Sequence, residues 1–294
     1  MPRKLLEEET AALDVSAALT RMESAMQYAL VNGEKREASR GLIGFCQGCD
    51  APMIPKCGPI KAPHWAHKSE ARCDPWWEKE TKWHRDWKEL FPADWREVRQ
   101  HDANGECHIA DIRTEHGLVI ECQHSSIGAP EIAARETFYQ SVGTMVWVVD
   151  GAGYKTGTSK LSISSKSWMT TPLPWLFTSS RPSDSFPKTW LNCSVPVFFD
   201  FASENTAGEQ IERMATIFCL LPGRAAGLAV IARISREYFV SRLRGGPEVF
   251  PYAAIMAELA NGLTLMRHSK ARQAQPIPPW RQIADYRNRN RRRF

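Results

Sequence analysis

Two acidic residues in one short amphipathic stretch constrain the fold of this chain more than any other feature. Residues 108–125 read His-Ile-Ala-Asp-Ile-Arg-Thr-Glu-His-Gly-Leu-Val-Ile-Glu-Cys-Gln-His-Ser. Apolar, β-branched residues lie on both sides of a polar segment that contains Gly117, which predicts a two-stranded hairpin. If the turn centres on His116, Asp111 lies directly opposite Glu121. Two opposed carboxylates destabilise a hairpin by up to about 1 kcal/mol unless a cation such as Mg²⁺ lies between them.

Period-2 alternation along the two strands predicts which side chains share a face. The face with the acids also holds Ile109, Arg113, Val119 and Gln123, and the other face holds Ala110, Ile112, Leu118, Ile120 and Cys122. The alternative is a surface hairpin in which each acid pairs separately with Arg113 or with a lysine. That arrangement is the commoner one for an arbitrary pair of acids, so the surrounding elements decide between the two.

The elements expected around the hairpin follow the order α-β-β-β-α-β. Asp74 is the expected N-cap of the first helix, with Pro75 at its first position. Apolar periodicity then indicates three strands, a second helix and a continuous apolar run that suits a buried strand. Outside the hairpin, the expected ranges are 75–90 for the first helix, 95–101 for the first strand, 130–140 for the second helix and 145–149 for the last strand.

Side chains of the two helices are placed near the acids by this order. Glu80 and His84 share a face of the first helix with Lys88. His84 either contacts a phosphate or an acid, or is a buried histidine bonded to a backbone carbonyl. Arg135 and Tyr139 share a face of the second helix, where Arg135 is either a phosphate clamp or a solvated charge.

Polar residues also follow the second acid along its strand. Gln123 lies on the same face as Glu121, where its amide could orient a water molecule for phosphodiester hydrolysis. His124 and Ser125 could contact a substrate phosphate. The alternative is a turn at Ser125-Ser126 that leads to the next helix.

Several short motifs occur in a fixed order over roughly residues 40–151. They are Cys46-Gln-Gly-Cys49, His64-Trp-Ala-His67, Glu80 with His84, His108-Ile-Ala-Asp111, Ile120-Glu-Cys-Gln-His-Ser125, Arg135 with Phe138-Tyr139, and Trp147-Val-Val-Asp150. In this order they resemble the competence protein CoiA family, whose core is similar to that of the PD-(D/E)XK nuclease superfamily. Each motif alone is weak, and their order makes the resemblance specific.

The resemblance implies an α/β (α+β) fold with a restriction-endonuclease-like αβββαβ core. It implies that Asp111 and Glu121 bind a catalytic Mg²⁺ or Mn²⁺, with Glu80 as the helical acid near the metal and His84 in the same site. Gln123 stands where the superfamily usually has a lysine. Because glutamine carries no positive charge and shuttles no proton, Gln123 can only orient water or phosphate through hydrogen bonds.

A cluster of cysteines and histidines precedes this core in a segment rich in Gly and Pro. A Cys-x-x-Cys pair followed within about thirty residues by a second pair of ligands is typical of a closed structural zinc site. The expected Zn²⁺ ligands are Cys46, Cys49, His67 and Cys73, with His64 or Cys57 as substitutes. The alternatives are buried thiols or a disulfide, which the charged, signal-free N-terminus disfavours. Because Asp74 follows Cys73 directly, such a zinc would fix the first helix.

Composition adds little to these expectations. The chain has 294 residues, 43% of them hydrophobic, and no apolar run approaches twenty residues. We therefore expect a cytoplasmic protein with no membrane partner. The net charge of +5 permits contact with phosphates without requiring it. Five arginines within the last eight residues are either solvated or lie along a nucleic-acid backbone.

The expected organisation divides the chain into five parts. These are an N-terminal helical segment (1–40) with a helix over about 13–30, a zinc-binding knob (41–74), the nuclease-like core (75–151), a tryptophan-anchored extension (152–207) and a helical C-terminal region with a basic tail (208–294). The expected C-terminal helices span 208–221, 223–243 and 251–268, with a strand at 196–200 before them. These helices would cover the core or form a homodimer.

The function predicted from these features is that of a metal-dependent nuclease acting on DNA of undefined strandedness. The resemblance implies processing or recombination of incoming DNA, in natural competence or mobile elements, with recombination proteins as partners. One alternative is a non-catalytic DNA-binding or recombination accessory protein that keeps the nuclease fold. Another is a zinc-dependent regulator in which the acids are structural.

Overall fold

A computed structural model describes residues 26–68, 73–76, 78, 80–151, 167–201 and 216–273, which form two β-sheets and four α-helices. The strands of the smaller sheet are β1 (Tyr28–Val31), β2 (Glu34–Glu37), β3 (Gly44–Phe45), β4 (Pro52–Lys56) and β5 (His64–His67). The larger sheet contains β6 (Arg96–His101), β7 (Cys107–Arg113), β8 (Leu118–Gln123), β9 (Thr144–Asp150), β10 (Trp168–Thr170), β11 (Leu176–Ser179), β12 (Val197–Asp200), β13 (Thr216–Leu220) and β14 (Ala229–Ser235). The helices are α2 (Lys82–Glu89), α3 (Ala129–Val142), α5 (Arg236–Gly245) and α6 (Tyr252–Gln273).

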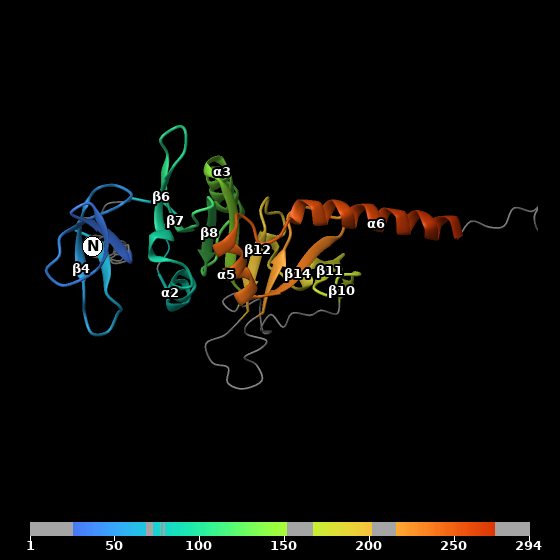
Figure 1. Ribbon diagram of the computed structural model, residues 1–294, viewed down its shortest axis with the longest axis horizontal. Coiled ribbons are helices and arrows are strands. Elements are labelled where there is room, and N and C mark those ends of the chain that lie inside the picture. Colours follow the sequence, from blue (N-terminus) through green and yellow to red (C-terminus); the bar gives the residue numbers. More distant parts are fainter. Residues whose placement is uncertain are drawn as a thin grey trace, which may run out of the picture.

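The strand order of each sheet shows how the chain is connected (Figure 1). The smaller sheet has the order β2-β1-β3-β4-β5, and the larger one has the order β10-β11-β14-β13-β12-β9-β8-β7-β6. The predicted order of elements is confirmed from α2 through β6, β7, β8 and α3 to β9. Strands β6, β7 and β8 are antiparallel, whereas β8, β9 and β12 are parallel neighbours. The chain is therefore a mixed α/β protein.

Helix α2 begins later than the sequence predicts. Its N-cap is Thr81, whose hydroxyl accepts the N–H of His84, while the His84 ring accepts the N–H of Thr81. Asp74, the predicted N-cap, instead accepts the N–H of Trp76 at 2.9 Å. The Asp74-Pro75 signal therefore marks a turn, and residues 73–80 precede the helix.

Two predicted helices of the C-terminal part are wrong over β13 and β14. Residues 216–220 and 229–235 are strands inside the larger sheet, and their apolar side chains are buried on both of its faces. A short β-branched run buried on both faces packs as a strand, and its periodicity alone does not distinguish it from a helix. Helix α5 begins only after its N-cap Ser235.

The other expectations outside the core have mixed outcomes. Strand β12 and helix α6 lie where the sequence predicts them. The helix expected over 13–30 is wrong at residues 28–30, which belong to β1. Its earlier part and the basic tail at 287–293 lie outside the described residues. Within the described part of the chain, no helix has both the length and the apolar character needed to cross a membrane.

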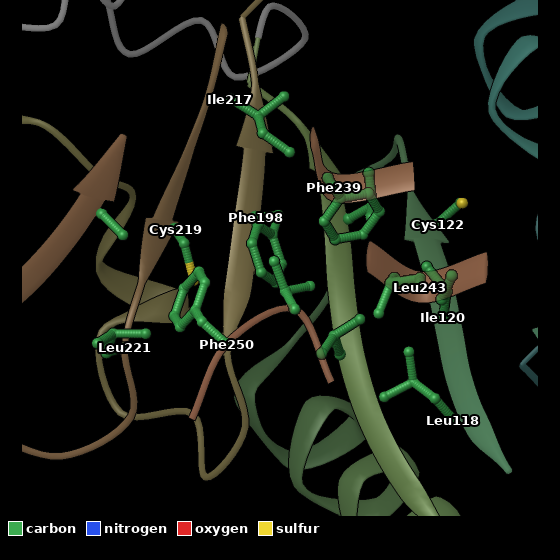
Figure 2. Close-up of a cluster of buried hydrophobic side chains, with 14 of the residues drawn as sticks. Leu118, Ile120, Cys122, Phe198, Ile217, Cys219, Leu221, Phe239, Leu243 and Phe250 are labelled. Carbon is green, nitrogen blue, oxygen red and sulfur yellow. The ribbon is translucent and has the colours of Figure 1, made fainter. Parts of the chain in front are cut away.

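Two apolar clusters cover the two faces of the larger sheet. Helices α2, α5 and α6 cover one face, and Figure 2 shows residues of this cluster from strands β8, β12 and β13 and from helix α5. Helix α3 and the segment around Trp190 cover the other face. Successive residues along a central strand pack into opposite clusters, so each central strand is buried on both faces.

The predicted hairpin forms between β7 and β8, with Gly117 in its turn at a φ of +83°. Ile112 pairs with Ile120, and the same register places Asp111 opposite Glu121, as predicted. The acids therefore meet across two neighbouring strands.

The predicted alternation of side chains fails at Asp111. Ala110 packs on the α3 side of the sheet, whereas Ile112 packs on the opposite side, although both were expected to share a face. The cause is an interruption of backbone pairing, because the N–H of Asp111 donates to the Glu121 carboxylate. On the other side of β7, the register of β6 places Glu97 opposite Asp111, and Glu97 has a φ of +46°.

The smaller sheet packs against β6 and β7 (Figure 1). The buried Glu97 carboxylate accepts the N–H groups of Gln27 at 3.1 Å and Tyr28 at 3.0 Å, both at the start of the smaller sheet. Ile109 of β7 packs on the small apolar cluster around Trp65. Two strands of the larger sheet thus form the contact between the two sheets.

Candidate functional site

The four predicted zinc ligands lie together beside the smaller sheet. The Sγ atoms of Cys46, Cys49 and Cys73 and a ring nitrogen of His67 all lie within 4.8 Å of one another. Cys46 Sγ is 3.4 Å from Cys73 Sγ, and Cys49 Sγ is 3.4 Å from His67 Nε2. The hydrogen bond between Cys46 and Cys73 lowers the pKa of the Cys46 thiol and raises that of Cys73, and burial raises the pKa of Cys49. A zinc ion would bind all three as thiolates. This Cys₃His group could hold a metal ion, and its donors fit zinc.

The two proposed substitutes do not join this cluster. Nδ1 of His64 lies 2.9 Å from the carbonyl oxygen of Ala62, in the loop before β5. Cys57 packs at the margin of the small apolar cluster. The structure therefore brings together the four chosen residues and leaves the two substitutes outside the group.

A short connection joins the cysteine cluster to β7. Asp74 follows Cys73, and its carboxylate contacts Nδ1 of His108 at 2.9 Å and accepts the N–H of Ile109 at 3.1 Å. The Trp76 ring stacks on the His108 ring with a centroid distance of 3.3 Å. The expectation that the cluster fixes the first helix is therefore wrong, because the connection through Asp74 fixes β7, the strand that carries Asp111.

Asp111 and Glu121 interact where the pairing of β7 and β8 stops. The Asp111 N–H donates to Glu121 Oε1 at 3.2 Å, and the Cys122 N–H donates to Asp111 Oδ2 at 2.9 Å. Each carboxylate thus takes a backbone donor from the opposite strand. Glu121 is buried beneath α3, where Nη1 of Arg135 lies 3.4 Å from Oε2 and the Tyr139 hydroxyl hydrogen-bonds to the carboxylate.

The electrostatics of the acid pair fit a divalent cation. Burial and the neighbouring Asp111 carboxylate raise the pKa of Glu121 to about 8. A cation between the two acids would remove this repulsion and keep both ionised. Two carboxylates with waters and phosphate oxygens are a common ligand set for Mg²⁺. Gln123 Oε1 is buried and has no hydrogen-bond partner among the described residues, so an acceptor for a water molecule lies in the same site.

Without added Mg²⁺ or Mn²⁺, the free energy of unfolding is expected to fall as the pH rises from about 4.5 to about 8. Because the pKa of Glu121 is higher in the folded protein than in the unfolded chain, the folded state binds more protons in this window. The stability that results is lost as the pH rises through the folded pKa, with a slope from this group of at most about 1.4 kcal/mol per pH unit. Urea denaturation of the parent and Glu121→Gln proteins across this pH range, without a chelator that would strip metal from the Cys₃His group, measures how much of the pH dependence comes from Glu121. If the free energy of unfolding depends on pH in the same way in both proteins, the raised pKa of Glu121 is contradicted.

Glu78 is the acid that faces Gln123, and sequence analysis missed it. Nε2 of Gln123 donates to Glu78 Oε2 at 2.9 Å, and Nε2 of His84 lies 3.5 Å from the same oxygen. Burial alone would raise the pKa of Glu78, but hydrogen bonds from His84 and Ser125 outweigh it and lower the pKa. A helix beginning at residue 75 turns Glu78 away from the face of His84. The helix begins at Lys82 instead, after the N-cap Thr81, and its capping box has His84 in the place of the usual Glu or Gln.

Glu80, the predicted helical acid, lies in a buried ion-pair network instead. Its carboxylate is 2.5 Å from Lys88 Nζ and 2.7 Å from Arg85 Nη2. Lys88 Nζ also lies 2.8 Å from Glu97. Despite complete burial, the negative charges of Glu97, Glu80 and Asp111 raise the pKa of Lys88. Lys88 therefore stays protonated and interacts electrostatically with Asp111. The negative charge of Glu80 is balanced by Lys88 and Arg85.

The other predicted site residues occupy well-defined places. Arg135 and Tyr139 share the face of α3 that contacts Glu121, as the spacing predicts, and Arg135 also donates to the Trp76 carbonyl at 2.7 Å. His84 combines both of its predicted roles, because Nε2 lies 3.0 Å from the Cys122 carbonyl and near the acid Glu78. Arg135 is thus buried as a clamp on Glu121.

His124 and Ser125 lie at the end of β8. Nδ1 of His124 is 2.6 Å from Asp150 Oδ2, at the end of the neighbouring strand β9. The Ser125 carbonyl accepts from Nε2 of Gln123 at 3.1 Å, and the Ser125 N–H donates to Glu78. Ser125 therefore forms part of the turn and also fixes the side chain of Gln123.

The comparisons with known proteins agree with the N-terminal part of this description. Residues 37–75 match the family model described as Competence protein CoiA, N-terminal domain. The match includes strands β3, β4 and β5 and all four residues of the Cys₃His cluster, and it supports a CoiA-like family. No curated protein and no solved structure matches the chain.

Proposed function

We propose that this chain is a Mg²⁺- or Mn²⁺-dependent nuclease that acts on DNA, with a core resembling that of the PD-(D/E)XK nucleases. The observation that carries the proposal is the meeting of Asp111 and Glu121 where β7 and β8 stop pairing. A pair of carboxylates, one of them with a raised pKa, is costly in an empty site and favourable beside a divalent cation. The α-β-β-β-α-β order of the surrounding elements supports the same function.

Each residue of the site has a definite part in this proposal. Asp111 and Glu121 would hold the cation, and Arg135 and Tyr139 orient the Glu121 carboxylate. When bound, the cation neutralises charge on the scissile phosphate and makes a bound water more acidic. Gln123 Oε1 would accept a hydrogen bond from the attacking water.

The hydrogen bonds of Gln123 orient its side chain to accept a hydrogen bond from the attacking water. Its Nε2 is held by Glu78 at 2.9 Å and by the Ser125 carbonyl at 3.1 Å, which leaves Oε1 as the acceptor. An amide held in this way orients a water molecule without carrying a charge. The positive charge that lysine provides in the superfamily would come here from Lys88, which is paired with Glu80 and Glu97 and also interacts electrostatically with Asp111.

The family match supports DNA as the substrate. Residues 37–75 match a competence-protein domain, and competence concerns the uptake and recombination of DNA. The Cys₃His cluster would bind a structural zinc. Asp74 bonds the backbone of β7, so this zinc would be connected to the strand that carries Asp111. Zinc would thus fix the position of one metal ligand without taking part in hydrolysis.

The test is incubation of labelled single-stranded, duplex and branched DNA with the protein in Mg²⁺ or Mn²⁺. We expect cleavage of at least one of the three forms, and none when only Ca²⁺ is added. Filter binding of the same substrates accompanies each reaction. Binding without cleavage of all three forms in both metals would contradict the nuclease.

A non-catalytic DNA-binding or recombination accessory protein is the second candidate. It is favoured by the uncharged Gln123 and by the contact between Arg135 and Glu121, which partly balances the acid without a metal ion. This function requires DNA affinity that survives the loss of both acids. It also requires that the parent protein cleave none of the three DNA forms in Mg²⁺ or Mn²⁺. Cleavage by the parent protein therefore distinguishes the nuclease from this accessory protein.

A further inference from the structure

The carboxyl ends of the parallel strands β8, β9 and β12 bring a second polar group to the site. His124 follows β8, Asp150 ends β9, and Asp200, the register partner of Asp150, ends β12. Asp200 is already bonded to the indole N–H groups of Trp83 and Trp87 and forms part of the scaffold. The pair of His124 and Asp150 has no part in the functions assigned above.

Asp150 holds the His124 ring in one orientation. Nδ1 of His124 lies 2.6 Å from Asp150 Oδ2, and the Asp150 side chain is only 7% exposed, whereas that of His124 is 37% exposed. An imidazole held at Nδ1 by a buried carboxylate exchanges its proton through Nε2. The exposure of His124 makes such an exchange with a bound ligand possible.

His124 lies beside the acid site. Its ring centroid is 5.9 Å from that of His84, and Nε2 of His84 contacts both the Cys122 carbonyl and the Glu78 carboxylate. Only Cys122 and Gln123 separate His124 from Glu121 along the chain. A phosphodiester that extends from the acid pair past His84 would therefore reach His124.

We propose that His124, positioned by Asp150, donates the proton to the leaving oxygen during phosphodiester hydrolysis. This inference rests on the proposed nuclease function. The water oxygen bonds to phosphorus, the ester bond to the leaving oxygen breaks, and that oxygen takes the proton from Nε2 of the His124 imidazolium. The water gives up its own proton to solvent. The ring remains neutral with its proton on Nδ1, bonded to Asp150, and solvent then reprotonates Nε2.

The test uses two DNA substrates that differ in the leaving atom, which is oxygen in one and bridging sulfur in the other. Sulfur leaves as a stable thiolate and needs no proton. In His124→Asn, the amide nitrogen replaces Nδ1 and can still donate to Asp150, but nothing replaces Nε2. We expect His124→Asn to cleave the oxygen substrate about 10²-fold more slowly than the parent, or slower still, and the sulfur substrate at nearly the parent rate.

A matched control and a readout independent of cleavage complete the test. His116→Asn changes a histidine at the turn of the hairpin and should leave both rates unchanged. Ring ¹⁵N spectra should show the neutral His124 ring with its proton on Nδ1 in the parent, and a shift toward the Nε2 form in Asp150→Asn. Asp150→Asn should also slow the oxygen substrate more than the sulfur substrate.

Each outcome bears on a specific claim. Equal loss of both substrates in His124→Asn, or no loss of either, would overturn the proton-donor assignment while the nuclease stands. A parent ring with its neutral proton on Nε2 would overturn the part assigned to Asp150. If the parent cleaves neither substrate, the nuclease function itself fails.

Discussion

Cys49→Ser is expected to abolish stoichiometric zinc binding and to unfold the smaller sheet. The apolar cluster of this sheet contains six buried residues among those described, which is too small a core to hold a five-stranded sheet unaided. Structural zinc contributes about 10–16 kcal/mol of apparent binding free energy in small zinc domains, so its loss outweighs the other interactions of the sheet.

Metal analysis and hydrogen exchange measure this effect. Freshly purified parent protein should hold close to one equivalent of zinc after dialysis, and amides of residues 26–68 should lose protection in Cys49→Ser. Cys57→Ser is the matched control, because Cys57 belongs to the same segment but lies outside the Cys₃His group. The Cys57→Ser protein should keep its zinc. Less than about half an equivalent in the parent would contradict the structural site.

Lys88→Met is expected to lower the free energy of unfolding by about 3–5 kcal/mol. The substitution removes the cation between the Glu80 and Glu97 carboxylates, at 2.5 and 2.8 Å, and leaves two buried acids without it. Glu97 also bonds the N–H groups of Gln27 and Tyr28, so the loss extends to the contact between the two sheets.

Urea denaturation of two matched lysine variants tests this expectation. Lys82 forms an ion pair with Asp86 at 2.6 Å on the exposed side of α2, so Lys82→Met should change stability by no more than about 1 kcal/mol. Adding Glu80→Gln to Lys88→Met should recover part of the loss, because it removes one of the unbalanced charges. A Lys88→Met effect as small as that of Lys82→Met would show that the network is not stabilising.

Local patterns in the sequence were sufficient to predict the hairpin and the cysteine cluster. The β-branched runs on either side of Gly117 fix the register of Asp111 and Glu121, because the turn sets the pairing of both strands. The candidate zinc ligands were predictable because Cys46 and Cys49 are separated by two residues and the other two candidates follow closely. In both cases the partners are near in sequence.

The residues that sequence analysis missed depend on contacts between distant segments. Glu78 contacts Gln123 across 45 positions, and it does so only because α2 begins at Lys82. Asp150 reaches His124 because β9 lies parallel to β8, which no local pattern determines. The predicted alternation failed at Asp111 because its backbone N–H bonds a side chain, a choice that depends on burial of Glu121.

Single-turnover cleavage of DNA by Asp111→Asn and Glu121→Gln proteins tests the central claim most directly. Both substitutions keep an acceptor for the backbone N–H groups seen in the structure, so they remove charge with little effect on the fold. Glu115→Gln, in the exposed turn of the same hairpin, is the control. We predict background cleavage for the two acid variants, with unchanged DNA binding, and parent activity for the control. Parent activity in either acid variant would contradict the assignment of this acid pair as the metal site.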